Sequence, residues 1–493
     1  MLRLASAFRR SRPDALPARI TKTIRTDICI IGAGSAGLSV AAAAAAFGRK
    51  VVLIEKHKMG GDCLNYGCVP SKALIAAAKR AHAMRTADAF GIDGVSPGID
   101  LSHVRAHVHD VIAAISPNDS VARFTGLGVQ VIQSLARFVD KKTVEAGELR
   151  IRARRFIIAT GSSPLVPPIA GLDNVPFFTN ETIFENCRKL EHLIVIGGGP
   201  AGLELAQAYG RLGSRVTVLE AAKSLGQSDR ELTSVVLDAM KKEGVEVREN
   251  TPVERVLGAS GAVQVAVSTL SGPETIAGTH LLVAGGRRPN ISDLNLEAAR
   301  IRYGKSGIAV NGGLRTSNRR VFALGDCTDG PRFTHVANYH AGIAIRRALF
   351  RLPARVNPAI IPSVTFTDPE LAYVGLSEEQ ARNRHGQIRV LRWPYHENDR
   401  AQAERATIGS IKVVTDRKGS ILGAGIVGEQ AGELIQMWSL AVSQGLNIKA
   451  MTNWISPYPT FSEISKRASY RYFAQAPSNP TLRKIADFMA WLG

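Results

Sequence analysis

The segment from Asp27 to Glu55 predicts a strand, a glycine turn, a helix and a second strand, in the sequence DICIIGAGSAGLSVAAAAAAFGRKVVLIE. The turn follows the pattern G-x-G-x-x-G at Gly32, Gly34 and Gly37. Glycine permits a tight turn there and a close approach of the backbone to a pyrophosphate at the helix N-terminus. Glu55 ends the second strand, where a carboxylate can accept hydrogen bonds from ribose hydroxyls. The segment therefore predicts a dinucleotide-binding unit, because strand, helix and acidic residue all stand where one requires them.

A second segment of the same kind begins at His192 and reads HLIVIGGGPAGLELAQAYGRLGSRVTVLE. Its second strand ends at Glu220, and its fingerprint glycines are Gly197, Gly199 and Gly202. One chain therefore carries two dinucleotide sites. Because a carboxylate at Glu220 would accept ribose hydroxyls and repel a 2′-phosphate, NADH is favoured over NADPH. Arg215 and Lys223 lie nearby without replacing the acid, so NADPH stays open.

Two cysteines stand five positions apart in the stretch GGDCLNYGCVPSK, residues 60 to 72. An ideal helix would hold the Cα atoms of Cys63 and Cys68 beyond the roughly 7 Å that a disulfide tolerates. A bridge needs a distorted turn, which Gly61, Gly67 and Pro70 permit. Such a pair would be strained and reducible, which suits a redox couple. The alternatives are two structural cysteines or half of a metal site, but a zinc site needs closer spacing and a second ligand pair.

Length and composition limit the class of protein. A chain of 493 residues is too long for one core and predicts two to four domains. Five cysteines, an odd number, indicate a reducing compartment, so we expect the bacterial cytoplasm. The basic residues 1 to 22 are similar in charge to a mitochondrial transit peptide, which makes the mitochondrial matrix the alternative. Lys and Arg exceed Asp and Glu by 62 to 42, but the arginines are dispersed and no nucleic-acid-binding motif is present. We therefore predict a solvated basic surface and no nucleic-acid partner.

The segments between and after the two nucleotide units carry weaker patterns. Residues 73 to 125 are predicted to be helical, residues 127 to 160 to form short strands, and the chain beyond Val356 to form an antiparallel sheet. His103 and His107 could share a metal on one helical face, but no third ligand stands out, and surface or packing roles are favoured. The final TLRKIADFMAWLG predicts an amphipathic helix that packs on the body of the protein rather than touching a membrane.

This order of motifs resembles the FAD-dependent pyridine nucleotide-disulfide oxidoreductases, the family of dihydrolipoamide dehydrogenase, glutathione reductase and mercuric reductase. The likeness runs over nearly the whole chain, and CLNYGCVPSK is its most specific stretch. It implies an α/β fold with two Rossmann-like dinucleotide-binding domains and a C-terminal α+β dimerisation domain. The expected divisions are a basic N-terminal arm (1–24), a FAD-binding domain (25–175 and 286–355), an NAD(P)-binding domain (176–285), a dimerisation domain (356–470) and a C-terminal tail (471–493).

The resemblance implies FAD and NADH as cofactors, a homodimer, and a small disulfide or dithiol substrate, with dihydrolipoamide as the default. Electrons would pass from NADH to the flavin and then to the disulfide, with Cys68 as the charge-transfer thiol and Cys63 as the exchanging thiol. Lys72 would pair with Glu204 beside the flavin, where a fixed cation stabilises the reduced ring. The implied FAD-binding residues are Gly32, Gly34, Gly37, Glu55, Lys72, Thr160, Gly161, Ser162, Asp326, Arg332 and His335. The implied NAD-binding residues are Gly197, Gly199, Gly202, Glu220 and Gly286.

The final motif departs from the family. Where the disulfide reductases have HPTxxE, with the histidine as acid and base, this chain has Tyr458, Pro459, Thr460 and then Glu463. A phenol, with a reference pKa near 10 against about 6.5 for imidazole, is a poor base at neutral pH, although Tyr458 could donate a hydrogen bond or act as an acid.

Two alternatives to disulfide chemistry follow. Mercuric reductases are similar in placing a tyrosine near this point, which makes a soft-metal-ion reductase the first alternative. They deliver the metal through C-terminal cysteines that the ending MAWLG does not contain. The second alternative is a basic flavoprotein scaffold with little turnover, and the intact set of Cys63, Cys68, Lys72 and Glu204 weighs against it.

Overall fold

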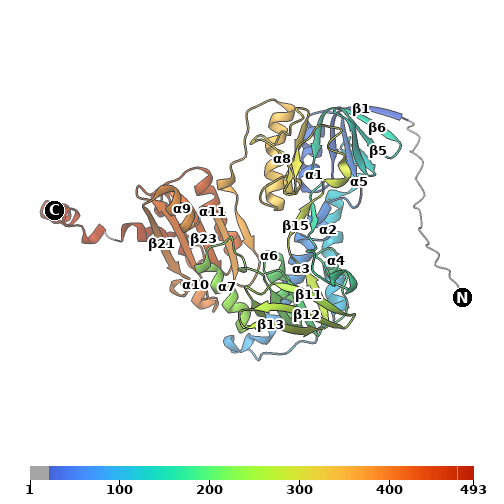
Figure 1. Ribbon diagram of the computed structural model, residues 1–493. Helices are drawn as coiled ribbons and strands as arrows, with labels where there is room; N and C mark the ends of the chain where they lie inside the picture. Colours follow the sequence, from blue (N-terminus) through green and yellow to red (C-terminus); the bar gives the residue numbers. More distant parts are fainter. Residues whose placement is uncertain (1–21, 475) are drawn as a thin grey trace. The chain divides into compact units, whose positions relative to one another are not determined.

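The computed structural model describes residues 22–474 and 476–493, which form two compact units (Figure 1). The first unit contains the described residues up to Gly61 with Asp119–Gly161 and Pro289–Ala354. The second contains Asp62–Asn118, Ser162–Arg288 and the described residues from Arg355. Nearly all of the predicted basic arm lies outside the described residues. In the part of the chain that the structure describes, no helix is long and apolar enough to cross a membrane.

The first unit is built on a seven-stranded sheet. Six strands lie in the order β3-β2-β1-β6-β5-β4, and the seventh, β18, pairs with β6. Strand β1 pairs in parallel with β2 and β6, and β18 pairs in parallel with β6. The central strands are buried on both faces, as continuous apolar runs in parallel sheets require. The strands are β1 Lys22–Ile31, β2 Val51–Glu55, β3 Gln130–Gln133, β4 Ala136–Asp140, β5 Thr143–Ala146, β6 Leu149–Ile158 and β18 Val321–Ala323.

Helices α1 (Ser35–Ala46) and α8 (Thr334–Leu349) lie side by side in the first unit (Figure 1). The alanine-rich face of α1 allows this close approach because alanine adds little bulk. A short helix, α5 (Val121–Gly126), leads into β3. The predicted strand, glycine turn, helix and strand between residues 27 and 55 are therefore confirmed, as are the short strands between 127 and 160.

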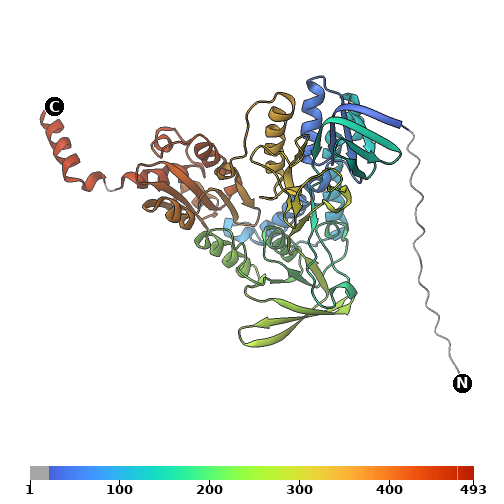
Figure 2. The same cartoon turned by 45° about the horizontal axis from the view of Figure 1, so that its top comes forward.

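The nucleotide-type sheet of the second unit is parallel and has the order β10-β9-β8-β14. A three-stranded antiparallel sheet, β11-β12-β13, belongs to the same unit (Figure 2). The elements are β8 His192–Ile196, α6 Pro200–Arg211, β9 Arg215–Leu219, α7 Arg230–Lys242, β10 Glu246–Arg248, β11 Val253–Ala259, β12 Ala262–Thr269, β13 Gly272–Gly278 and β14 His280–Val283.

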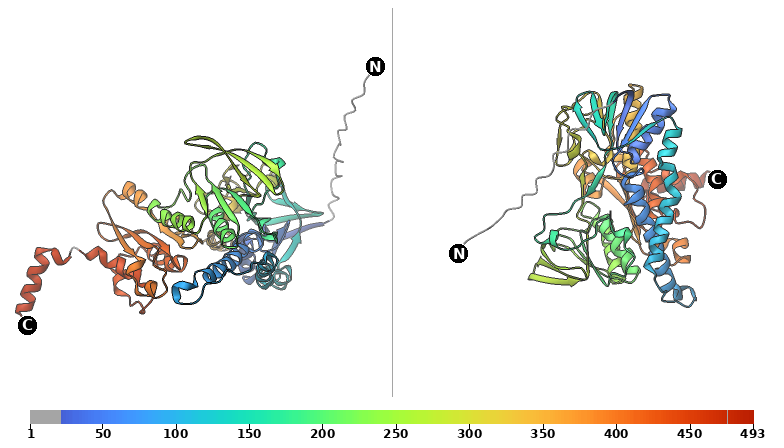
Figure 3. Two further views of the ribbon diagram at one scale, coloured as in Figure 1. Left: turned by 90° about the horizontal axis from the view of Figure 1, so that it is seen from below. Right: turned by 90° about the vertical axis from the view of Figure 1, so that its right-hand side faces the viewer.

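The segment after the first nucleotide motif is helical, as predicted, and consists of α2 (Gly61–Asn65), α3 (Cys68–Arg85) and α4 (Leu101–Ile115). Helix α3 runs beside α4 and α6 (Figure 3). His103 and His107 lie exposed on α4. Within the described residues, no group of three or more His, Cys, Asp or Glu side chains could hold a metal ion. By their exposure, His103 and His107 are surface residues.

The C-terminal part of the second unit is the predicted antiparallel sheet, in the order β19-β20-β23-β22-β21. Helix α11 packs on this sheet, and its fully buried Trp438 donates from Nε1 to Ser465 Oγ at 3.1 Å. The elements are β19 Ser363–Thr365, β20 Glu370–Gly375, α9 Glu378–His385, β21 Ile388–Pro394, α10 Asp399–Ala403, β22 Ser410–Asp416, β23 Ile421–Gly428, α11 Ala431–Ser443, α12 Ala450–Asn453 and α13 Glu463–Tyr470. With the two nucleotide folds, this sheet confirms the predicted fold class.

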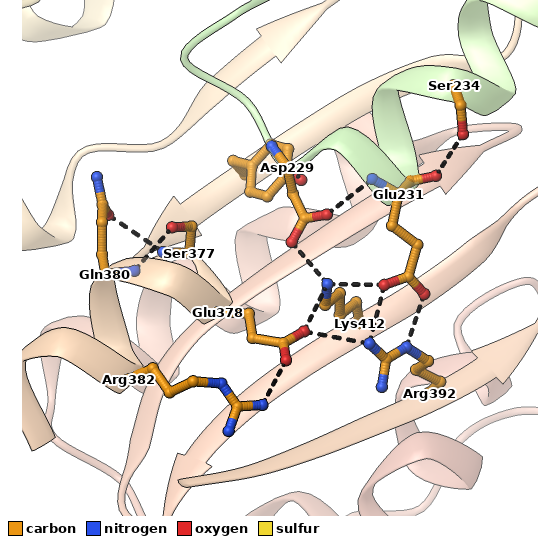
Figure 4. Close-up of polar contacts among 10 residues, drawn as sticks. Asp229, Glu231, Ser234, Ser377, Glu378, Gln380, Arg382, Arg392 and Lys412 are labelled. Atoms are coloured by element: carbon orange, nitrogen blue, oxygen red, sulfur yellow. Dashed lines mark hydrogen bonds and ion pairs between the residues drawn. The ribbon is translucent and has the colours of Figure 1, made fainter. Parts of the chain in front are cut away.

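A buried lysine joins α7 to the C-terminal sheet (Figure 4). Lys412 on β22 has a side chain only 6% exposed, and its Nζ lies 2.7 Å from Asp229, 2.7 Å from Glu231 and 2.8 Å from Glu378. Arg392 contacts Glu231 and Glu378 as well. Hydrogen bonds from Arg392, and then from Lys412, lower the pKa of Glu231 to about 2. These five side chains, the Lys412 cluster, satisfy one another's charge.

The C-terminal helix α14 (Pro480–Trp491) does not pack as predicted. None of its side chains is buried, and its large apolar residues are between 46% and 79% exposed. Its amphipathic spacing predicts an apolar face, and that face is present. The expectation that the face packs on the body is wrong, because periodicity does not specify what covers a helix.

Candidate functional site

The first glycine turn lies in the first unit, where Gly34 caps α1. A Cβ at Gly37 would stand 1.9 Å from the carbonyl oxygen of Gly32, and one at Gly32 would stand 2.3 Å from the carbonyl oxygen of Ala159. Gly32 also has φ +104°, which side-chain-bearing residues rarely adopt. The Glu55 carboxylate accepts from Ala33 N at 2.7 Å and from His57 N at 2.8 Å. The structure thus brings together all four predicted residues of this motif.

The second glycine turn repeats this geometry in the second unit. A Cβ at Gly202 would stand 2.0 Å from the carbonyl oxygen of Gly197, and one at Gly197 would stand 2.4 Å from that of Ala284. The Glu220 carboxylate accepts from Gly198 N at 2.7 Å and from Ala222 N at 2.9 Å. In both turns, a side chain on the glycines would fill the space that brings strand, turn and helix together. Both turns therefore fit the pyrophosphate and ribose of a dinucleotide.

The other residues implied for the first nucleotide lie on turns. Thr160 and Gly161 are held by Asn290: Thr160 Oγ1 donates to Asn290 O at 2.6 Å, and Asn290 N donates to Gly161 O at 2.9 Å. Asp326 is half-buried in the turn Gly325–Cys327, where Gly325 N donates to the ring of His340.

Arg332 lies just before α8 and His335 lies in its first turn, in the first unit. The His335 ring stacks on Phe333 with 5.1 Å between ring centroids, and Arg332 Nη2 donates to Ser306 O at 3.4 Å. Ser162, which was also implied for FAD, belongs to the second unit, and so does Gly286, which was implied for NAD. Gly286 accepts from Leu165 N at 2.9 Å and has φ +118°.

The cysteine pair lies on a broken helix. Helix α2 contains Cys63 and ends at Asn65, and α3 begins at Cys68, so the chain breaks at Tyr66 and Gly67. This break is the distorted turn that the spacing predicts. Cys63 is half-buried and Cys68 is exposed. Pro70 lies in the first turn of α3, where proline is tolerated.

The other three cysteines are poor candidates for thiol chemistry. Burial raises the pKa of the Cys327 thiol to about 11 and that of Cys29 well above its usual value. Both therefore stay protonated near neutral pH, where the thiolate is the reactive form. Cys187 is exposed and stands alone in the chain outside the predicted motifs. Cys63 and Cys68 remain as the candidate pair.

The predicted ion pair between α3 and α6 is present. Lys72 Nζ lies 2.7 Å from Glu204 Oε2, and the Glu204 side chain is only 7% exposed. Phe366 adds two contacts, because its backbone N donates to Glu204 Oε1 at 2.9 Å and its ring lies 4.3 Å from the ammonium. Lys72 follows Cys68 by four residues, so both side chains stand on one face of α3.

The loop between the cysteines is braced by contacts that sequence reasoning missed. Asp62 Oδ1 lies 3.0 Å from Arg287 Nη2 and accepts from Asn180 Nδ2 at 3.3 Å. Asn180 Nδ2 also donates to the carbonyl oxygen of Tyr66 at 3.0 Å. Arg287 is held in turn by Ser162, whose Oγ and backbone oxygen accept at 2.7 and 2.8 Å. The sequence offered one signal for these contacts, because Asp62 stands directly before Cys63.

Tyr458 is 70% exposed, and its hydroxyl donates to Asp399 Oδ2 at 3.0 Å. That hydrogen bond and the carboxylate charge raise the pKa of Tyr458 above the usual value for a phenol. Glu463, the residue expected to hold the side chain at this position, begins α13. The hydrogen-bond partner is therefore Asp399, on α10, rather than the glutamate of the family motif.

The chain has two glycine turns of the dinucleotide-binding kind and a cysteine pair at a helix break. These features define an oxidoreductase that uses two dinucleotides and a thiol couple. Residues 26–341 match the family described as pyridine nucleotide-disulphide oxidoreductase, and residues 361–469 match the dimerisation domain of that family. The chain belongs to this family. It is an FAD-dependent oxidoreductase that uses NAD(P)H, and its dimerisation domain supports a homodimer.

Similar proteins include both mercuric reductases and dihydrolipoyl dehydrogenases. A mercuric reductase from Lysinibacillus sphaericus is 35% identical over 449 residues, covering 90% of this chain and 82% of that protein. A dihydrolipoyl dehydrogenase from Thermus scotoductus is 35% identical over 467 residues, covering 91% of this chain and 98% of that protein. Among solved structures, LpdA from Mycobacterium tuberculosis has a TM-score of 0.84 and 28% identity, covering 90% of this chain and 99% of that one. Overall identity thus does not separate the two activities.

Proposed function

We propose that the chain uses NAD(P)H to reduce a small-molecule disulfide, with Cys63 and Cys68 as the redox couple. The observation that carries the proposal is the break between α2 and α3, on either side of which the two cysteines stand. A continuous helix would keep their Cα atoms beyond the roughly 7 Å that a disulfide spans, whereas a broken helix allows the bond to form and open. FAD, when bound, supplies two-electron chemistry between NAD(P)H and a disulfide.

The two sulfurs act in sequence on the substrate. In the reduced pair, the Cys63 thiolate attacks one substrate sulfur, so that the substrate S–S bond breaks, a mixed disulfide forms and one substrate thiolate leaves. The Cys68 thiolate then attacks the sulfur of Cys63, which releases the second substrate thiolate and restores the Cys63–Cys68 bond. Two electrons pass to the substrate, and each released thiolate takes up one proton.

Lys72 is the positioning cation of the pair. It stands one helical turn beyond Cys68, and Glu204 and Phe366 hold its ammonium in place. Cys68 begins an 18-residue helix, so its sulfur stands at the positive end of a helix dipole. A helix N-terminus and a nearby cation both favour the thiolate form that thiol exchange requires.

Tyr458 favours the reductive direction over dithiol oxidation. Oxidising dihydrolipoamide requires a base that removes a thiol proton. Because Asp399 raises the pKa of Tyr458 above the usual 10, the phenol stays protonated at neutral pH and cannot act as that base. Lipoamide, rather than dihydrolipoamide, is therefore the substrate form that we expect the protein to use.

The Tyr458→His variant is expected to oxidise dihydrolipoamide at least about tenfold faster at pH 7.5, because a positioned general base contributes roughly 10²- to 10⁴-fold. Initial rates of NAD⁺ reduction measure this, and the rate should rise with pH through about 6.5, the reference pKa of imidazole. Tyr470→His, at another exposed tyrosine of the same segment, is the matched control and should leave the rate unchanged. An equal rate in Tyr458→His and wild type would exclude this role for position 458.

A soft metal ion such as Hg(II) is the second candidate acceptor. Metal reduction needs thiolates but little proton transfer, so a protonated Tyr458 is no obstacle to it, and several similar proteins are mercuric reductases. Oxidation of NADPH and NADH should be measured with Hg(II) in excess thiol and, separately, with lipoamide. Turnover with Hg(II) and none with lipoamide would mean that the substrate is the metal ion and not a disulfide.

Glu220 is proposed to select NADH over NADPH. Both of its oxygens are held by backbone N–H groups, and the carboxylate would accept ribose hydroxyls and repel a 2′-phosphate. Glu220→Ala is expected to lower the ratio of kcat/KM for NADH to that for NADPH by about tenfold or more, since hydrogen bonds to a charged group contribute about 1.5–3 kcal/mol. Glu191→Ala, at an exposed glutamate of the same unit, should leave the ratio unchanged. An unchanged ratio in Glu220→Ala would mean that another residue selects the nucleotide.

A further inference from the structure

Helix α14, at the end of the chain marked C in Figure 2, has an apolar face along its length. Trp491 extends this face, because its ring stacks on that of Phe488 with 6.2 Å between ring centroids. These large apolar side chains are between 46% and 79% exposed, so the described residues leave the face open to solvent. The other residues of the face recur mostly every three or four positions, which places them on one side of the helix: Leu482, Ile485, Phe488, Met489 and Leu492.

The segment that carries this face is basic. Arg483 and Lys484 stand between two of its apolar residues, Leu482 and Ile485. A helix with an apolar face and basic flanks is typical of those that lie on a membrane surface, where anionic lipid attracts the charges. From residue 464 to residue 486 the chain contains no acidic residue and five basic ones, of which all but the first are exposed: Lys466, Arg467, Arg471, Arg483 and Lys484.

A second copy of the chain is the alternative cover for the apolar face. The match to the dimerisation domain ends at residue 469, whereas α14 begins at Pro480. The chain also has a net charge of +20, so a second copy offers the basic segment a surface of the same sign. An anionic bilayer offers the opposite sign. Charge complementarity therefore favours lipid over another copy of this protein.

We propose that α14 docks the protein on a membrane surface that contains anionic lipid. Its 12 residues extend about 18 Å as a helix, which is short of the roughly 30 Å hydrocarbon core, so the helix lies along the surface and does not cross it. The apolar face enters the boundary between headgroups and acyl chains, and Arg483 and Lys484 extend to the lipid phosphates. Docking is separate from the reaction of the cysteine pair, because α14 contributes no residue to the candidate site.

The test is co-sedimentation of full-length holoenzyme with vesicles of phosphatidylcholine, either alone or with about a third phosphatidylglycerol. We expect binding to the anionic vesicles to weaken as salt is added, and binding to phosphatidylcholine alone to be at least about tenfold weaker. Arg483→Gln with Lys484→Gln should weaken anionic binding at least about tenfold, since each basic residue near such a surface contributes about fivefold. Arg188→Gln with Lys189→Gln, at another exposed Arg-Lys pair, is the matched control and should bind as wild type.

Phe488→Ser tests the apolar contact separately from the charge. It should weaken binding about tenfold, the lower end of the effect of burying a phenylalanine ring. Phe90→Ser is the matched control, because Phe90 is 56% exposed and Phe488 is 57% exposed. All these variants should keep the thermal transition of wild type, since each changed side chain is exposed.

Loss of binding in both α14 variants, with both controls binding as wild type, supports the proposal. Absence of binding by wild type would overturn it, and so would equal binding by wild type and both α14 variants, since another basic surface would then meet the lipid. A loss in the charge variant alone would overturn burial of the apolar face. Sedimentation velocity without lipid tests the second copy: a monomeric Phe488→Ser beside a dimeric wild type would place α14 on the partner subunit and contradict docking on lipid.

Discussion

Cys63→Ser and Cys68→Ser are each expected to lower NAD(P)H-dependent disulfide reduction by at least about 10³-fold while the protein still binds FAD. Serine is close in size to cysteine but does not exchange with a disulfide, and removing one member of a nucleophilic pair removes the whole pathway. FAD retention is expected because the predicted glycine turn of the first unit contains neither cysteine. Steady-state rates with lipoamide, measured with the flavin content of each variant, test the expectation.

Cys187→Ser is the matched control, because Cys187 is the exposed cysteine outside the pair. It should keep the wild-type rate and flavin content. A Cys63→Ser protein with a tenth or more of the wild-type rate would show that electrons reach the substrate without the couple. The protein would then be a flavin-dependent reductase with no role for the cysteines.

Lys412→Met is expected to lower the free energy of unfolding of the second unit by about 3 kcal/mol, near the lower end of the values found when one partner of a buried ion pair is removed. The change leaves Asp229, Glu231 and Glu378 close together without the cation between them. The lower end applies because Glu231 is partly exposed and solvent screens part of the repulsion. Urea denaturation followed by circular dichroism measures the change.

Arg382→Met is the matched control, since Arg382 also pairs with Glu378 but its own side chain is 57% exposed (Figure 4). An exposed pair four residues apart on a helix contributes only about 0.3–0.5 kcal/mol. Equal losses in Arg382→Met and Lys412→Met would mean that burial of the lysine has no special effect.

The Lys412 cluster also predicts how stability depends on pH. Hydrogen bonds from Arg392, and then from Lys412, lower the pKa of Glu231 from 4.5 to about 2 in the folded protein. The carboxylate is charged in both states above pH 4.5, so its stabilisation is complete there and is lost as the pH falls towards 2. The urea concentration at half-unfolding of wild type should therefore decrease as the pH is lowered from 4.5 to about 2. This decrease should be smaller in Lys412→Met.

The features that sequence reasoning predicted are those that residue type and spacing determine locally. Glycine is required at Gly32 and Gly197 because a Cβ would clash with the backbone just after a neighbouring strand, at Ala159 and Ala284, and the glycine pattern records that requirement. The five-residue cysteine spacing likewise predicts a helix break, which the structure places at Tyr66 and Gly67. The strands of both nucleotide folds follow from apolar runs and turn residues, for the same local reason.

The features that it missed are contacts between residues far apart in the chain. Asn180 lies 118 positions from Asp62, and Asp399 lies 59 positions from Tyr458. Nothing in the local pattern of either residue specifies its partner. Lys412 did leave a signal, a charged residue at an inward position of an apolar strand, but only the fold shows the carboxylates that surround it. The expectation that α14 packs on the body of the protein was wrong for the same reason. Helical spacing of apolar residues predicts an apolar face but does not specify which surface covers it.

NAD(P)H is expected to reduce a Cys63–Cys68 disulfide in this protein. The direct measurement is to treat purified holoenzyme with NADH without oxygen, alkylate with a mass-tagged reagent and locate the tags by peptide mass spectrometry. We predict two new tags per chain, at Cys63 and Cys68, that appear only with NADH. Equal tagging of both cysteines with and without the nucleotide would contradict the claim.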